Sequence, residues 1–111
     1  MTLTLPWQAF ALVVGHFALD YPLQGDTTAR EKNPNSTTPL QAAVPWWYWM
    51  TAHALMHAAA VAAITGSGVF AAIEFVVHFA LDYAKCQGWI SIHTDQACHL
   101  LTKGVFLWAS V

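Results

Sequence analysis

Long apolar stretches alternate with polar breaks along the chain, and each stretch is of helical length. The stretches predict four helices, at about residues 5–21, 45–65, 69–87 and 95–111. Pro6 suits the first turn of the first helix and Pro22 ends it, because proline lacks the backbone N–H that a helix interior needs. Gly88 is the expected end of the third helix, and Thr94-Asp95 is the expected cap of the fourth. The pattern therefore predicts an all-α chain.

One long polar stretch interrupts this pattern at residues 23–44. It is rich in Asp, Thr, Asn, Ser and Pro and predicts a loop, with a short helix around Thr28–Lys32. A loop of this length in a small domain is usually functional or disordered. The chain of 111 residues is expected to form a single four-helix domain, 1–111.

Composition favours a membrane protein. Hydrophobic residues make up 57% of the chain and charged residues only 9%, against roughly 25% charged residues in an ordinary soluble domain. The predicted helices would measure about 25–31 Å, close to a bilayer core of about 30 Å, and Trp and Tyr gather near their ends as in interfacial belts. We therefore expect an antiparallel four-helix transmembrane bundle in the inner (cytoplasmic) membrane. A soluble bundle with an aromatic core is the alternative.

Charge sets the expected orientation and excludes one class of partner. Arg30, Lys32 and Lys85 fall at one end of the predicted bundle, so the positive-inside rule predicts that this end faces the cytoplasm. With four Lys and Arg in total and a net charge of −2, the chain has no basic surface for nucleic acid. Cys86 and Cys98 are expected to pack as small apolar side chains.

The phrase His-Phe-Ala-Leu-Asp-Tyr occurs twice, at 16–21 and at 78–83. Each copy ends an apolar stretch and sets a histidine four residues before an aspartate, which places both side chains on one face of a helix. The repeat suggests two duplicated helical hairpins related by a pseudo-twofold axis.

Four such i,i+4 pairs, one per predicted helix, fall at the same depth of an up-down bundle. They predict a metal site between the helices with these ligands: His16, Asp20, His53, His57, His78, Asp82, Asp95 and His99. Imidazole and carboxylate ligands suit zinc first, with iron or manganese as alternatives. The set is large enough for two ions, or for one ion with a strong second layer of contacts.

Other polar residues near this level have candidate roles in catalysis or substrate binding. Glu74, Asp20 and Asp82 are the candidate catalytic carboxylates; Glu74 could instead be a ligand or a buried protonated acid. The candidate substrate-binding residues are Gln24, Lys32, Lys85 and Gln96. Lys103 interrupts the fourth helix and is expected to reach the surface or to pair with a carboxylate, and His93 is expected to lie in the loop before that helix.

The motifs together carry a family resemblance that covers almost the whole chain. They are His16…Asp20-Tyr-Pro-Leu-Gln24, a loop lysine such as Lys32, His53-x-x-x-His57, Glu74-Phe-x-x-His78-x-x-x-Asp82-x-x-Lys85 and Asp95-Gln96-x-x-His99. This combination resembles an uncharacterised family of small bacterial and phage membrane proteins, domain of unknown function three-three-zero-seven. The resemblance implies short transmembrane helices and a His/Asp-rich polar set, but no activity. The polar pattern is also loosely similar to that of membrane-bound metal-dependent hydrolases.

The favoured interpretation is a membrane-embedded, metal-dependent hydrolase acting on a lipid or another anionic head group, although the sequence leaves open whether the protein is an enzyme. The alternatives are a haem or di-iron redox protein, a metal or proton transporter, and a non-catalytic membrane component stapled by metal. The expected partners are membrane lipid, a second copy of the chain or another membrane protein.

Overall fold

The computed structural model describes residues 3–111, and in this part of the chain it contains six helices and no strand. They are α1 (Leu5–Asp20), α2 (Gly25–Glu31), α3 (Pro39–Ala43), α4 (Trp46–Thr65), α5 (Gly68–Cys86) and α6 (Ile92–Ala109). The prediction of an all-α fold is therefore confirmed. The four long helices cover the four stretches predicted from the apolar pattern.

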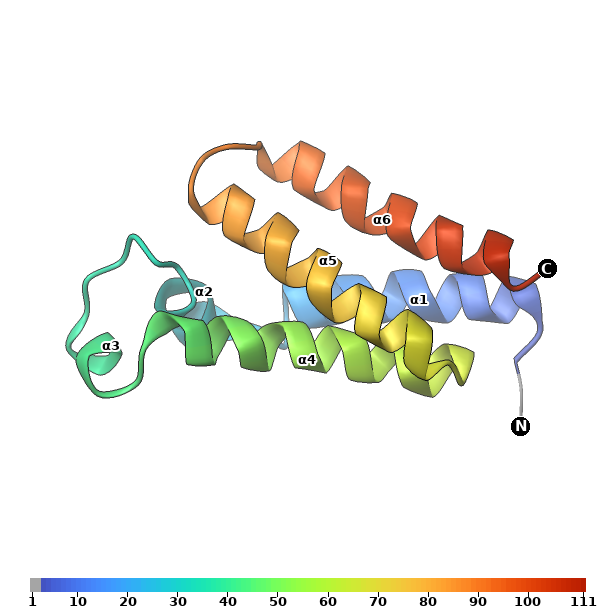
Figure 1. Cartoon of the computed structure of the whole chain (residues 1–111), viewed down its shortest axis with the longest axis horizontal. Helices are drawn as coiled ribbons and strands as arrows, with labels where there is room; N and C mark the ends of the chain where they lie inside the picture. Colours follow the sequence, from blue (N-terminus) through green and yellow to red (C-terminus); the bar gives the residue numbers. More distant parts are fainter. Residues whose placement is uncertain (1–2) are drawn as a thin grey trace.

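The long helices run alternately up and down and form an elongated bundle, with overall dimensions of 46 × 26 × 23 Å (Figure 1). α4 and α5 form the closest-packed pair; α1 packs on α4 and α6, and α5 also packs on α6. The short helices α2 and α3 lie at one end of the bundle, and the start of α1 and the end of α6 lie at the other (Figure 1). The first and second halves of the chain thus each contribute two long helices to one interior.

The polar stretch at 23–44 is more ordered than a loop, because it contains α2 and α3. The buried Glu31 carboxylate accepts a hydrogen bond from the Thr38 hydroxyl at 2.5 Å. The Gln41 amide donates to the backbone oxygens of Glu31 and Asn33 at 2.9 and 3.0 Å. These bonds connect the residues at the end of α2 to those around α3. The short helix expected around Thr28–Lys32 is present, but it begins three residues earlier and ends one residue earlier, at Gly25–Glu31.

α6 begins three residues earlier than its predicted start. The Ser91 hydroxyl accepts a hydrogen bond from the backbone N–H of Thr94 at 3.1 Å, which makes Ser91 the N-terminal cap. Thr94 and Asp95 therefore lie inside the first turn. His93 lies there too and is exposed, instead of belonging to the preceding loop.

The interior of the bundle is more polar than apolar. A hydrophobic cluster of Leu12, Val61 and Phe106 lies toward the terminal end, with Phe70 stacked on Phe106 at 4.8 Å between ring centroids. Among the described residues, six hydrophobic side chains are buried, against twelve polar or charged ones. Because an unpaired buried polar group costs free energy, these twelve must satisfy one another or hold a ligand.

The predicted transmembrane bundle and its inner-membrane localisation, with the site facing the cytoplasm, are wrong. Within residues 3–111, no helix combines the length and the apolar character needed to cross a bilayer. α1, with 16 residues, is about 24 Å long and thus short of a core of about 30 Å. α5 and α6 are longer but carry charged side chains along their inner faces: Glu74, Asp82, Asp95 and Lys103. The high hydrophobic content of the whole chain did not show that these charged side chains interrupt the apolar stretch of each helix.

The turn between α4 and α5 depends on Gly66, which caps α4 in the left-handed region with φ 72°. Replacing Gly66 with alanine should lower the free energy of unfolding by about 1 kcal/mol, because a Cβ is disfavoured at that φ. Gly68→Ala is the matched control, since Gly68 is two residues away at the start of α5 and has ordinary φ. Urea unfolding should find the control neutral or stabilising; equal losses in both variants would contradict the argument.

Candidate metal centre

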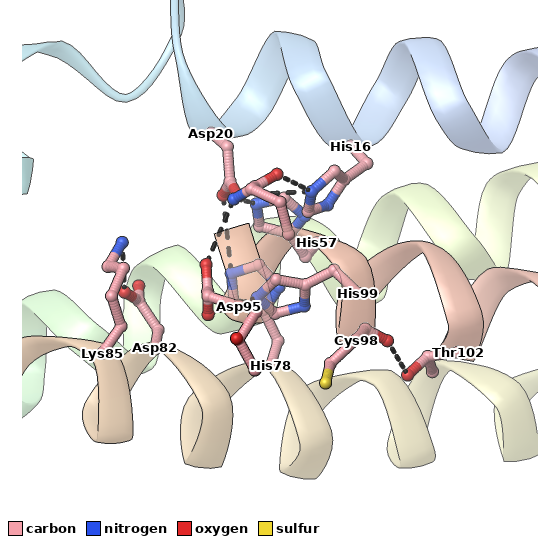
Figure 2. A network of polar contacts seen from close by, with 12 residues as sticks. His16, Asp20, His57, His78, Asp82, Lys85, Asp95, Cys98, His99 and Thr102 are labelled. Carbon is pink, nitrogen blue, oxygen red and sulfur yellow. Dashed lines mark hydrogen bonds and ion pairs between the residues drawn. The ribbon is translucent and has the colours of Figure 1, made fainter. Parts of the chain in front are cut away.

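Each long helix directs a stripe of polar residues, spaced four apart, into the bundle. The stripes are His16 and Asp20 on α1, His53 and His57 on α4, Glu74, His78 and Asp82 on α5, and Asp95, His99 and Lys103 on α6. Figure 2 shows side chains from three of these stripes and His57 of the fourth pointing toward one another. The structure thus brings all eight predicted metal ligands together, with Glu74 added to them.

These side chains form four overlapping groups that could hold a metal ion, and within each group the ligand atoms lie within 4.8 Å of one another. The groups are His16/Asp20/His57/His78, His53/His78/Asp82, Glu74/His78/His99 and Asp20/Asp95/His99. His78 belongs to three of them and is fully buried. The first group alone offers four ligands, and it combines three helices.

Asp20 is the point on which the imidazoles converge. Its carboxylate oxygens lie 2.8 Å from Nε2 of His57, 3.4 Å from Nε2 of His16 and 3.6 Å from Nε2 of His78. His53 Nε2 is 3.2 Å away, and the Gln96 amide donates to Oδ2 at 3.0 Å. Ligands about 2.0–2.1 Å from a tetrahedral zinc ion are about 3.4 Å from one another. The separations of 3.4 and 3.6 Å from Asp20 to His16 and His78 are close to the edges of such a site, and the 2.8 Å separation to His57 is shorter.

Several of the buried ring nitrogens have no hydrogen-bond partner. Both nitrogens of His78 and of His99 are in this state, as is His57 Nε2. His57 Nε2 lies 2.8 Å from an Asp20 oxygen, but this contact does not have the geometry of a hydrogen bond. Unpaired imidazole nitrogens facing a carboxylate are the donor set that a divalent cation would satisfy.

The protonation states of this group also suit a metal. Burial by itself would raise the pKa of Asp20, but contacts from His53, His57 and Gln96 outweigh it and hold the pKa well below the usual range. Burial lowers the pKa of His16 to about 4 and lowers those of His57 and His78 as well. At neutral pH the carboxylate is thus ionised and the three imidazoles are neutral, which are the forms that bind metal.

Asp82, the counterpart of Asp20 in the repeated phrase, faces lysines as well as histidine. Lys32 Nζ donates to its Oδ2 at 2.5 Å, and Lys85 Nζ lies 3.0 Å from its Oδ1. Burial would raise the pKa of Asp82, but the two ammonium charges lower it to about 2. The two copies of the phrase have therefore acquired different partners, and Asp82 is already neutralised by side chains of the protein.

Lys103 forms a buried ion pair with Glu74, deeper in the bundle than Asp20. Of the two outcomes expected for Lys103, pairing with a carboxylate is the one observed. Sequence reasoning did not include it in the site, although its position four residues after His99 and eight after Asp95 continues the inward stripe of α6. That spacing was the signal that could have identified it.

A pocket of about 120 Å³ opens beside Asp20, lined by Asp20, Tyr21, Gln24, Lys32, Lys85, Ile92 and Gln96. All four predicted substrate-binding residues line it. Of the three predicted catalytic carboxylates, Asp20 reaches the pocket, whereas Glu74 and Asp82 are not part of its wall. The pocket therefore gives access to the centre from the end of the bundle that carries α2.

Comparison with known proteins places the chain in a family but assigns no activity. A family model described as "Protein of unknown function (DUF3307)" matches residues 9–107, which include every residue of the centre. No curated protein and no solved structure matches the chain. The membrane character and the similarity to metal-dependent hydrolases that were expected from the resemblance find no support in these comparisons. The match covers most of the chain, and the protein belongs to the DUF3307 family.

Proposed function

We propose that the protein is a metal-dependent hydrolase whose ion is held by His16, Asp20, His57 and His78. One observation carries the proposal: three buried imidazoles, each with a lowered pKa, direct Nε2 at a single ionised carboxylate at 2.8–3.6 Å. Nitrogen and carboxylate ligands in a four-coordinate set favour zinc, with iron or manganese as alternatives.

The residues around the centre have separate tasks in this proposal. A bound divalent ion would supply an acidified water molecule and would polarise the bond to be cleaved. Asp20 is the carboxylate that both belongs to the four-ligand group and lines the pocket, so it accepts the proton. Gln96 donates to Asp20 by its amide, and its Oε1 accepts a hydrogen bond from Nε2 of His16 at 2.8 Å. Metal binding by that nitrogen would replace this hydrogen bond and move the proton of the ring to Nδ1. Glu74 and Asp82, each paired with lysine, balance charge and take no part in proton transfer.

The pocket favours a small anionic substrate group such as a phosphate. Lys32 and Lys85 line the pocket and both contact Asp82. With a divalent ion bound at Asp20, positive charge would exceed negative charge beside the pocket. Gln24 and Gln96 add amide groups that can hydrogen-bond oxygen atoms. At about 120 Å³ the pocket is well below the roughly 300–1,000 Å³ of sites for drug-sized ligands, so it suits a head group or a small ester.

Metal analysis of the purified protein tests the first half of the proposal. We expect about one equivalent of zinc per chain by mass spectrometry, and a fall of at least tenfold in bound zinc for His57→Ala, because one of four ligands is lost. His93→Ala is the matched control, since His93 is exposed and outside the centre, and it should keep the zinc. Wild-type protein without zinc, iron or manganese, after exposure to each, would end the proposal.

A non-catalytic role for the metal is the second candidate, and the composition of the interior favours it. With twelve buried polar residues against six hydrophobic ones among the described residues, the bundle has a small apolar core. A metal that joins three helices would stabilise such a fold directly. In that case chelation would lower the melting temperature strongly, while zinc-loaded protein would hydrolyse neither phosphate esters nor carboxylic esters.

A further inference from the structure

A second place where a metal could bind shares His78 with the four-ligand group, which consists of His16, Asp20, His57 and His78. Glu74, His78 and His99 bring their ligand atoms within 4.8 Å of one another, and all three residues are buried. Glu74 Oε2 and both ring nitrogens of His99 have no hydrogen-bond partner. By chemistry and burial alone, this group is as suitable for a divalent cation as the group around Asp20.

A cation of the protein's own is already paired with the carboxylate of this group. Lys103 Nζ donates to Oε1 of Glu74, and both side chains are almost fully removed from solvent. Lys103 is therefore a buried positive charge held within this group by Glu74.

The charges of the centre favour a single added ion. Four carboxylates, those of Asp20, Glu74, Asp82 and Asp95, face three ammonium groups, those of Lys32, Lys85 and Lys103. This leaves an excess of one negative charge. One divalent ion changes the excess to one positive charge, which an anionic substrate can neutralise. A second divalent ion would add two more positive charges to the buried centre. With Lys103 present, two ions would leave an excess of three positive charges. Without Lys103 the excess would be two, and loss of a proton from a bridging His78 would lower it to one. Because uncompensated buried charge is strongly unfavourable, Lys103 opposes the second ion.

We infer that Lys103 is a built-in cation that takes the place of a second metal ion and limits the centre to one divalent ion per chain. The inference rests on the proposed metal binding and deepens it. Lys103 is a positioning residue: it holds the Glu74 carboxylate away from the ion, so that the ion binds at Asp20, beside the pocket, instead of at the inner position.

Removing the ammonium group should open the inner position. After zinc loading and gel filtration, we expect one equivalent of zinc in the wild type and two in Lys103→Met. In the variant Glu74 and His99 are free of the ammonium group and can bind an ion together with Nδ1 of His78, whose ring would bridge the two ions after giving up its second proton to solvent. The double variant Lys103→Met/Glu74→Gln should return to one equivalent, since the inner carboxylate is gone. Cobalt substitution gives an independent readout, because a second ion in a different ligand set should add its own visible absorption bands.

Glu74→Gln in the presence of Lys103 tests the same inference without depending on the folding of Lys103→Met. Glu74 is not a ligand of the single ion, so this variant should keep one equivalent of zinc with less than a threefold change in affinity. Loss of the zinc in Glu74→Gln, or a single equivalent in folded Lys103→Met, would overturn the inference while the proposed metal binding survives. Two equivalents of zinc in the wild type would also overturn the inference and leave the proposed metal binding intact. Absence of metal from the wild type and from every variant would end both the inference and the proposed metal binding.

Discussion

Asp20→Asn is expected to remove the bound metal and to lower the rate of hydrolysis by about 1,000-fold, corresponding to about 4 kcal/mol of transition-state stabilisation. Asparagine has nearly the shape of aspartate but lacks its charge. Asp20 is the carboxylate on which Nε2 atoms of His16, His57 and His78 converge, so a neutral amide there leaves the ion with imidazoles alone. The packing of α1 against α4 should be preserved.

The measurement combines zinc content with hydrolysis of chromogenic phosphate monoesters and diesters by the zinc-loaded protein. Asp26→Asn is the matched control, because it makes the same chemical change at a residue that is exposed in α2 and lies outside the centre. It should retain the zinc and the full rate. If Asp20→Asn kept both, Asp20 would be neither ligand nor proton acceptor, and the proposed mechanism would fail. If the wild type held zinc but cleaved no ester, the stabilising role of the metal would be favoured instead.

Lys32→Met is expected to lower the free energy of unfolding by about 3 kcal/mol, because it leaves the buried Asp82 carboxylate without its closest counter-charge. Lys32 and Asp82 side chains are only 4% and 2% exposed, and their charged atoms are 2.5 Å apart. Lys32 follows α2, so the same contact also fastens the segment at 23–44 to α5. Urea denaturation monitored by circular dichroism would measure the change.

Lys85→Met provides the comparison, since Lys85 contacts the same carboxylate but its side chain is 27% exposed. Solvent screens this charge, and Asp82 would keep Lys32, so the expected loss is below about 1 kcal/mol. The double variant Lys32→Met/Asp82→Asn should recover part of the stability lost in Lys32→Met, because no buried charge is then left unpaired. Equal losses in the two lysine variants would show that burial does not set the strength of these pairs.

The helices and their polar stripes were predictable because both follow from local periodicity. Pairs spaced four apart, such as His53 and His57, must share a face of any helix that contains them. The short helices were less predictable, since α2 and α3 depend on bonds such as those from Gln41 to the backbone at Glu31 and Asn33. The prediction of membrane insertion was wrong because the hydrophobic content is an average over the whole chain. That average does not show that the inner faces of the helices carry charged residues such as Glu74, Asp82 and Lys103.

The sequence by itself determined which side chains face the interior, since spacing along a helix decides this before any helix packs. Only the tertiary structure decided how those side chains pair: Asp20 lies among imidazoles, whereas Asp82, in an identical hexapeptide, lies between Lys32 and Lys85. Identical local sequences cannot encode that difference. It arises because Lys85 follows one copy on the same helix and Lys32, at the end of α2, reaches that copy, whereas α6 brings Gln96 to the other.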